Sequence, residues 1–153
     1  QGFEAGAIGL LGVSMGAAAS LGVLALEPQI QAVVADCGYA DLPALIGSRW
    51  RALIRLPLVF ALPGWWLAQR LAGADLSEAR PVRWIRQVDG HKVLIIHGDR
   101  DGVVPVQDAY ALWAARPECD LWVLRGAGHG GCYARDPEAY LERVTAFFES
   151  RLL

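Results

Sequence analysis

The chain has 153 residues, of which 54% are hydrophobic, and its formal net charge is −2. This length and composition favour a single domain over residues 1–153 with a sizeable apolar core. The 14 basic residues are scattered among 16 acidic ones rather than gathered in a basic stripe, which excludes nucleic-acid binding as the basis of the function.

The cysteines and the first residue bear on the compartment. Cys37, Cys119 and Cys132 are odd in number and lack the C-x-x-C spacing of zinc sites, so we expect free thiols, buried or partly buried, and neither a metal nor a cofactor. The chain begins at Gln1 rather than at methionine, so we expect a fragment or a processed product whose targeting region is not present here. The sequence therefore does not fix the cellular compartment of the protein, although it favours the cytoplasm.

The most informative stretch is residues 7–18, AIGLLGVSMGAA, an apolar run of strand length followed by an alanine-rich helix. At the junction, Ser14 lies between Gly12 and Gly16 in the pattern G-x-S-x-G. This pattern is typical of a nucleophile elbow, a strained strand-to-helix turn that exposes a serine hydroxyl above the sheet edge while small neighbours avoid clashes. The alternative is a serine that only caps the start of the helix.

The elements after Ser14 indicate a parallel α/β sheet. We predict a helix over Met15–Glu27, ended by Pro28, and a second strand over Ile30–Asp36. A strand, a helix and a strand joined by short connections are typical of a right-handed parallel crossover.

Residues 41–90 interrupt the alternation of strands and helices, and they are predicted to be helices broken by prolines. One interpretation is an amphipathic helical layer that covers the sheet, and the other is a small cap whose tryptophans line a pocket for an acyl group. The longest apolar stretch, Leu56–Ala68, is too short for a transmembrane helix and is interrupted by prolines and a glycine. The tryptophans of this excursion are Trp50, Trp65, Trp66 and Trp84.

Two further strands are predicted in the C-terminal half. Lys92–His97 is followed by the polar loop 98–105, a helix over Val106–Ala115, a strand over Cys119–Leu124 and the loop 126–131. In parallel α/β sheets the chemistry takes place at the carboxyl ends of the strands, where both loops lie.

The chain closes with a predicted helix that is capped by Asp136 and has Pro137 in its first turn. Taken together, the elements predict an α/β fold, a three-layer sandwich with a short parallel sheet of about four strands. The apolar stripe of the closing helix is Leu141, Val144, Phe148 and Leu152.

A serine, an acid and a histidine follow predicted strands in the order Ser14, Asp101, His129. That order is the one used by α/β-hydrolases. With GVSMG, VVADCGYAD, VLIIHGDRDGVVP and GAGHGG in succession, the chain resembles the α/β-hydrolase superfamily, and within it the bacterial serine hydrolases related to the Bem46 proteins and the prolyl-oligopeptidase-like esterases. The resemblance spans essentially the whole chain and implies a truncated α/β-hydrolase fold that begins at the nucleophile-elbow strand.

The resemblance also implies roles for the site residues. Ser14 would be the nucleophile, His129 the general base and then the general acid, and Asp101 the carboxylate that orients the imidazole. The backbone N–H of Met15 would stabilise the oxyanion. Asp99 is the rival acid, but Asp101 matches the D-x-x-V-P pattern of the family, and we expect Asp99 to cap the loop or to meet solvent.

Other polar residues near these loops receive structural interpretations. We expect His97 to be packed and hydrogen-bonded, His91 to be exposed beside Lys92, and Asp36 to stabilise the turn after its strand. Cys132 lies near the predicted base in sequence, but no second motif supports a cysteine nucleophile.

The resemblance implies a sheet of eight strands, of which this chain supplies the last four. The neighbour of the elbow strand, and the loop that donates a second oxyanion N–H, would then lie outside the chain. We therefore expect an exposed apolar edge that favours self-association or association with a missing N-terminal portion.

These observations predict a carboxylic-ester hydrolase that acts on short to medium acyl esters through an acyl-enzyme. The alternatives are a non-catalytic interaction module and a hydrolase that is active only with its missing N-terminal half. Amide, thioester and peptide substrates stay open. The apolar stretch Leu56–Ala68 is in addition a candidate surface for lipid binding.

Overall fold

The computed structural model describes residues 8–152, so the expectations about Gln1 lie outside the described residues. The described chain separates into two compact units. One unit takes in the residues up to 40 and from 81 onwards, and the other comprises residues 41–80. The single domain predicted over residues 1–153 stays a prediction.

Four parallel strands form the sheet of the first unit, in the order β1 (Ile8–Val13), β2 (Ile30–Asp36), β3 (Val93–Gly98) and β4 (Asp120–Leu124). Every residue of β3 is buried. Parallel strands covered on both faces need apolar side chains on both sides, which explains the continuous apolar runs of β2 and β3 in the sequence. The predicted parallel sheet of about four strands is confirmed.

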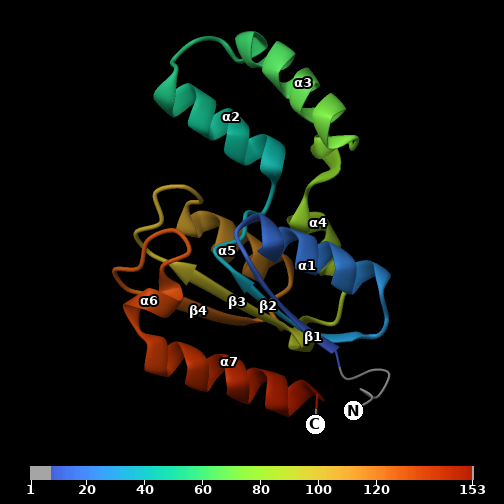
Figure 1. The fold of residues 1–153 in the computed structure, drawn as a ribbon, viewed down its shortest axis with the longest axis vertical. Helices are drawn as coiled ribbons and strands as arrows, with labels where there is room; N and C mark the ends of the chain where they lie inside the picture. Colours follow the sequence, from blue (N-terminus) through green and yellow to red (C-terminus); the bar gives the residue numbers. More distant parts are fainter. Residues whose placement is uncertain (1–7, 153) are drawn as a thin grey trace. The chain divides into compact units, whose positions relative to one another are not determined.

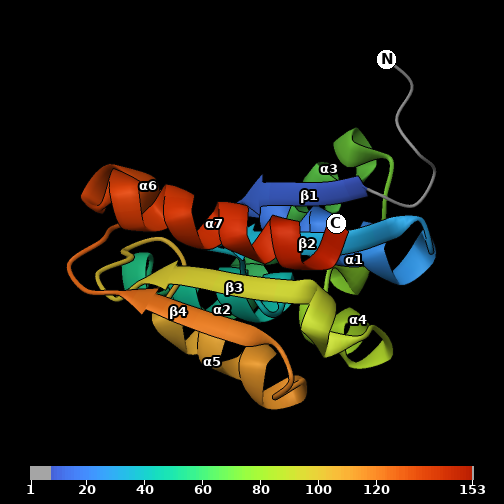
Figure 2. The same cartoon turned by 90° about the horizontal axis from the view of Figure 1, so that it is seen from below.

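Helices cover both faces of this sheet, and the resulting three layers are visible in Figure 1 and Figure 2. The helices α1 (Met15–Leu26), α4 (Pro81–Trp84) and α5 (Val106–Ala115) lie on one face. The helices α6 (Cys132–Arg135) and α7 (Pro137–Leu152) lie on the other. Two short 3-10 turns precede β3, namely η3 (Ile85–Gln87) and η4 (Gly90–Lys92).

The helix α7 shows where the predicted packing is partly wrong. Asp136 caps the helix by accepting the Ala139 N–H at 3.1 Å, as predicted. Leu141, however, is 54% exposed, and Tyr140 lies buried in the core instead. The physical reason is that the Tyr140 hydroxyl donates a hydrogen bond to the buried carboxylate of Asp36, which fixes the face that α7 turns to the sheet.

The strand β1 lies at one end of the sheet and pairs only with β2 among residues 8–152. Three of its apolar residues are exposed by 38% to 46%, namely Ile8, Leu11 and Val13. The exposed apolar edge predicted for this strand is therefore present in the described part of the chain.

The second unit is helical and consists of α2 (Leu42–Leu53), η1 (Leu58–Ala61), α3 (Leu62–Ala72) and η2 (Leu76–Glu78). Asp41 begins α2 by accepting the Ala44 N–H at 2.9 Å. Residues 81–90, which the sequence assigned to the same excursion, belong to the first unit.

We find no single helix within residues 8–152 that is apolar and long enough to cross a membrane. The segments Leu42–Leu53 and Leu58–Ala72 meet the criterion only as a pair, and they are bent by 113°.

Candidate active site

Ser14 occupies the junction between β1 and α1 in a strained backbone conformation. Its φ is 56° and its ψ is −116°, values that a residue with a side chain rarely adopts. The Ser14 N–H donates to the Asp36 carbonyl at 2.8 Å, which ties the turn to the neighbouring strand β2. The Ser14 side chain makes no capping hydrogen bond to α1, so the interpretation of Ser14 as a simple helix cap is wrong.

The two glycines of the G-x-S-x-G pattern differ in how closely they are packed. A Cβ atom at Gly12 would collide with the carbonyl group of Gly16, whereas a Cβ atom at Gly16 would meet nothing within 4 Å. The turn therefore requires the first glycine for its close backbone approach, and the second position has room for a side chain.

Of the three residues predicted as a catalytic group, His129 lies within hydrogen-bonding distance of both of the others. The Oγ of Ser14 is 2.9 Å from Nε2 of His129, and Nδ1 of His129 is 2.7 Å from Oδ2 of Asp101. In neutral histidine this geometry is satisfied when Nδ1–H donates to the carboxylate and Nε2 accepts the serine hydroxyl. The three loops that follow β1, β3 and β4 thus meet at the carboxyl edge of the sheet.

The Asp101 side chain is fully buried. Its Oδ1 accepts the N–H groups of Val103 and Val104, both at 2.8 Å. Burial acts to raise the pKa of Asp101, but the hydrogen bonds from His129, Val104 and Val103 outweigh it, so the pKa lies below its ordinary value. Asp101 is therefore ionised at neutral pH and able to orient the imidazole.

His97 supports the loop that carries Asp101. It is fully buried, with Nε2 3.0 Å from the Val104 carbonyl and 3.5 Å from Oδ2 of Asp101. A proton on Nε2 therefore donates to Val104 and faces the carboxylate. The prediction of a packed, hydrogen-bonded histidine is confirmed, and the contact of His97 with Asp101 is a feature that the sequence did not indicate.

Asp99 and His91 take the structural positions expected for them. Oδ1 of Asp99 accepts the Gly126 N–H at 2.5 Å, which joins the loop after β3 to the loop after β4. Asp99 thus caps a loop, as predicted. His91 is exposed next to Lys92, also as predicted.

Asp36 behaves differently from its predicted role. Its side chain is buried, and Oδ2 accepts the hydroxyl proton of Tyr140 at 3.0 Å, so it joins β2 to α7 rather than bracing the turn after its own strand. Next to it, Sγ of Cys37 lies 3.7 Å from Sγ of Cys132. Neither pairing has a signal in the sequence, because 104 residues separate the first pair and 95 separate the second.

Two groups of side chains come close enough to hold a metal ion in purely geometric terms. They share Cys37, which joins Asp36 and Cys132 in one group and Asp101 and His129 in the other. The hydrogen bond with Cys37, together with burial, raises the pKa of the Cys132 thiol far above its ordinary value. In both groups, members already form hydrogen bonds with one another, Cys37 with Cys132 and Asp101 with His129. The three cysteines are free and buried, as predicted.

Met15 opens α1 directly after Ser14. As the first residue of a helix it has a backbone N–H without an intrahelical acceptor, and the helix dipole places partial positive charge at this end. The His129 side chain is 24% exposed, so the group of polar side chains is open to solvent. The assignment of Met15 to the oxyanion stays a prediction.

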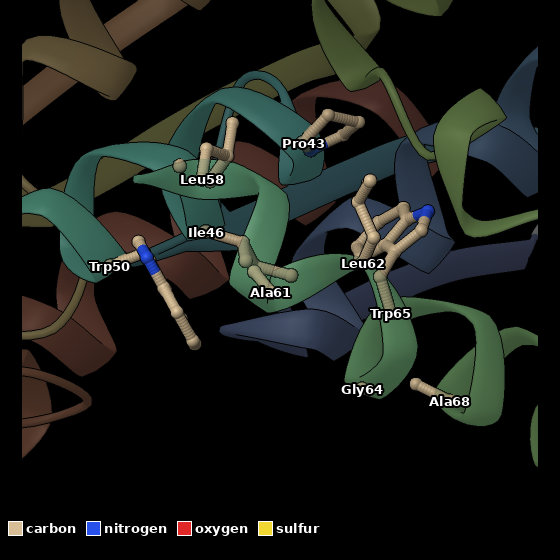
Figure 3. A pocket seen from close by; sticks show the side chains of 10 residues that line it. Pro43, Ile46, Trp50, Leu58, Ala61, Leu62, Gly64, Trp65 and Ala68 are labelled. Carbon is tan, nitrogen blue, oxygen red and sulfur yellow. The ribbon is translucent and has the colours of Figure 1, made fainter. Parts of the chain in front are cut away.

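The second unit contains an apolar cavity of about 390 Å³. Figure 3 shows that it lies between α2 and the segment formed by η1 and α3, with Trp50 and Trp65 among its lining residues. Of the four tryptophans predicted in the excursion, Trp66 is exposed and Trp84 belongs to the first unit, where it lies against Gly22 of α1.

No protein-family model matches the sequence, and no match is found among curated proteins. Solved structures do match. The chain is similar to the Pyrococcus furiosus esterase Pf2001, with 24% identity and a TM-score of 0.70 over 95% of this chain and 54% of that chain. It is also similar to a puromycin-hydrolyzing peptidase of Mycobacterium tuberculosis, with 22% identity and a TM-score of 0.69 over 94% of this chain and 22% of that chain.

A third similar structure is an alpha/beta hydrolase from the sediment metagenome of the Mar Chica lagoon in Morocco. It shares 19% identity and a TM-score of 0.64, over 95% of this chain and 63% of that chain. The chain spans about half the length of the esterase that it matches. These similarities show that the chain has the α/β-hydrolase fold, as the sequence motifs implied.

Proposed function

We propose that this chain carries the catalytic residues of a carboxylic-ester hydrolase that acts on short to medium acyl esters. The observation that supports the proposal is a chain of two hydrogen bonds. Oδ2 of Asp101 lies 2.7 Å from Nδ1 of His129, and Nε2 of His129 lies 2.9 Å from Oγ of Ser14. A hydroxyl within reach of a base that is itself oriented by a carboxylate is the arrangement that activates serine at neutral pH.

In the acylation step, Oγ of Ser14 attacks the carbonyl carbon of the ester while Nε2 of His129 takes the hydroxyl proton. The tetrahedral oxyanion accepts a hydrogen bond from the Met15 N–H at the start of α1, where the helix dipole favours negative charge. The imidazolium then protonates the leaving alcohol oxygen, the ester C–O bond breaks, and the acyl group remains on Ser14.

In the deacylation step, His129 takes a proton from water, and the resulting hydroxide oxygen attacks the acyl carbon. The bond between this carbon and Oγ breaks, Ser14 regains its proton from His129, and the carboxylic acid leaves. The lowered pKa of Asp101 supports its part in both steps, because an ionised carboxylate stabilises the imidazolium that forms twice in each cycle.

The choice of an ester as the substrate rests on one of the similar solved structures. One of the similar solved structures is an esterase, although another is a peptidase. The preference for short to medium acyl groups stays the prediction that the tryptophan-rich residues 41–90 suggested. Amide hydrolysis by the same residues is the chemical alternative.

The experiment is a series of p-nitrophenyl esters, from acetate to octanoate, offered to the wild-type chain and to Ser14→Ala. The proposal expects turnover by the wild type and loss of turnover in the variant. Equal turnover by the two proteins would contradict it.

A second candidate is a hydrolase that is active only with a further strand paired to β1. The one-sided pairing of β1 and its exposed apolar side chains favour this candidate. A folded wild-type chain without turnover, which gains turnover when a polypeptide that pairs with β1 is added, would select it over the first candidate.

A further inference from the structure

The second unit exposes an apolar surface that the proposed hydrolysis does not use. We propose that this surface, formed by η1 and α3, binds the interface of a bilayer that contains anionic phospholipids. We call it the η1–α3 surface and define it by Val59, Phe60, Trp66, Leu67 and Leu71.

The first observation is that η1 and α3 are apolar yet contain no buried residue. Nine of the eleven residues of α3, LPGWWLAQRLA, are apolar, and only Gln69 and Arg70 are polar. Phe60, Trp66 and Leu71 are 62%, 64% and 79% exposed. A helix that is apolar nearly all round needs apolar surroundings, which these exposed side chains lack within the unit.

The second observation is that packing within the unit uses a different part of α3. Leu62, Trp65 and Ala68 line the cavity that α3 shares with α2, as Figure 3 shows. Trp66 and Leu71 do not line this cavity. At about 100° per residue, Leu67 lies opposite to the middle of the face formed by Leu62, Trp65 and Ala68, and Trp66 and Leu71 lie on either side of Leu67. Contacts with α2 therefore leave the η1–α3 surface without a partner inside its own unit.

The third observation is the charge around this surface. The second unit, residues 41–80, contains five arginines against three acidic residues, in a chain with a net charge of −2. Arg51, Arg55 and Arg70 are exposed. Anionic lipids attract such a cluster, and the long side chain of arginine lets its charge reach the headgroups while the apolar residues enter the acyl region. Tryptophan is the residue type that prefers this boundary.

The same charges argue against a second copy of the chain as the occupant. A symmetric pairing of two η1–α3 surfaces would bring Arg51, Arg55 and Arg70 of both copies together. Asp75, which lines a pocket with Trp66 and Arg70, would offset only one of these charges in each copy. An anionic bilayer supplies the opposite charge. The bend of 113° between α2 and the segment Leu58–Ala72 also fits helices that lie along the interface.

The experiment is flotation of the whole chain with vesicles of phosphatidylcholine alone and of phosphatidylcholine with phosphatidylglycerol at about 7:3. We expect binding to the anionic vesicles that weakens as salt is added. The double variant Phe60→Ser, Trp66→Ser loses about tenfold or more in partitioning, because two exposed apolar side chains no longer enter the acyl region. Leu26→Ser, which removes an apolar side chain exposed to 79% at the end of α1, is the matched control and binds as the wild type.

A triple variant separates the electrostatic part. Arg51→Gln, Arg55→Gln and Arg70→Gln together reduce binding to anionic vesicles by on the order of a hundredfold, at about fivefold for each charge. Equal binding to neutral and anionic vesicles, or unchanged flotation of the Phe60, Trp66 variant, would overturn the proposal.

Analytical sedimentation without lipid tests whether a second copy of the chain binds the η1–α3 surface instead. A wild-type oligomer that the Phe60, Trp66 variant converts to a monomer would assign the surface to a second copy and would also overturn the proposal. A sedimentation profile that is the same for both proteins supports it. Circular dichroism of each variant confirms that the exposed substitutions leave the fold intact.

Discussion

Asp99 and Asp101 belong to the same loop after β3, yet their carboxylates have different partners. Oδ2 of Asp101 lies 2.7 Å from Nδ1 of His129, whereas Oδ1 of Asp99 accepts the backbone N–H of Gly126. Only the carboxylate next to the imidazole has to carry charge when the imidazolium forms. The two residues therefore form a matched pair for mutagenesis.

Asp101→Asn should lower kcat of ester hydrolysis by about 10⁴, because an amide in this position favours the wrong histidine tautomer. Asp99→Asn should keep kcat within about threefold, because an asparagine oxygen still accepts the N–H of Gly126 and such a neutral hydrogen bond contributes only about 1 kcal/mol. Steady-state kinetics on one p-nitrophenyl ester compares them. Similar losses in both variants would remove the distinction that we draw between the two carboxylates.

The lowered pKa of Asp101 also predicts a pH dependence of stability. In the unfolded chain the carboxyl binds its proton near 3.8, and in the folded chain it does so at a lower pH. The unfolded state thus binds more protons in this interval, so the contribution of Asp101 is fully present above about pH 4 and is lost as the pH falls through the folded pKa.

Urea unfolding of the wild type and of Asp101→Asn from about pH 6 down to pH 3 measures this contribution. The free energy of unfolding should fall more steeply with acid in the wild type, because the variant has no carboxyl at this position to protonate. Parallel curves would show that this carboxylate contributes nothing to the acid dependence.

The sequence indicates Ser14, His129 and an acid of the loop 98–105 because each follows a predicted strand of a parallel sheet. Only the resemblance to the D-x-x-V-P pattern of the family selects Asp101 over Asp99. The sequence does not allow the hydrogen bond between Asp36 and Tyr140, or the contact between two thiols, to be predicted. Those partners are about a hundred residues apart and belong to no local pattern. Long-range side-chain pairs of this kind are decided by the packing of whole layers.

At the scale of elements, the tight junction of β1 and α1 is the feature on which the site depends. It combines a positive φ at Ser14 with a backbone approach that leaves no room for a side chain at Gly12. The burial of Ala17 beneath this turn, against Gly38, shows how small residues let the helix begin so close to the sheet.

Gly12→Ala and Gly16→Ala should therefore have opposite effects on stability. The first forces a methyl group against the carbonyl of Gly16 and should cost about 3 kcal/mol or more in free energy of unfolding. The second meets open space in a helix and should be neutral or stabilise by about 0.5 kcal/mol. Urea denaturation of both variants measures the difference, and equal destabilisation would contradict the described turn.

Element boundaries were predictable where local signals were strong. The strand Ile30–Asp36 and the helix Val106–Ala115 have the predicted ends, since glycine and proline punctuate the sequence next to them. The buried face of α7 was not predicted correctly, because Leu141 satisfies the helical period as well as Tyr140 does. The hydroxyl contact to Asp36 decides between them, and periodicity carries no information about it.

At the scale of the whole molecule, the main feature is the edge of strand β1 that pairs with no other strand among the described residues. The strand is paired on one side among the described residues, and its exposed side chains are apolar. Edge strands of this kind pair with other chains unless charge or proline protects them. The chain also spans only about half of the similar esterase.

Leu11→Lys should therefore reduce association of the chain, because it places a charge on the exposed edge while the strand keeps its pairing with β2. Leu141→Lys, which alters an exposed position on α7, serves as the control. Sedimentation velocity over a range of concentrations distinguishes the two variants. A wild-type chain that is monomeric throughout would contradict association through β1.

The central claim is that His129 and Asp101 activate Ser14, and labelling by a fluorophosphonate tests it most directly. The reagent bonds covalently to an activated serine, and intact-mass spectrometry followed by peptide mapping locates the adduct. We predict one adduct on Ser14 that is absent in Ser14→Ala and at least about a hundredfold slower to form in His129→Gln, because general-base assistance contributes about that much or more. A folded wild-type chain without an adduct, or one labelled at the same rate after His129→Gln, would contradict the account.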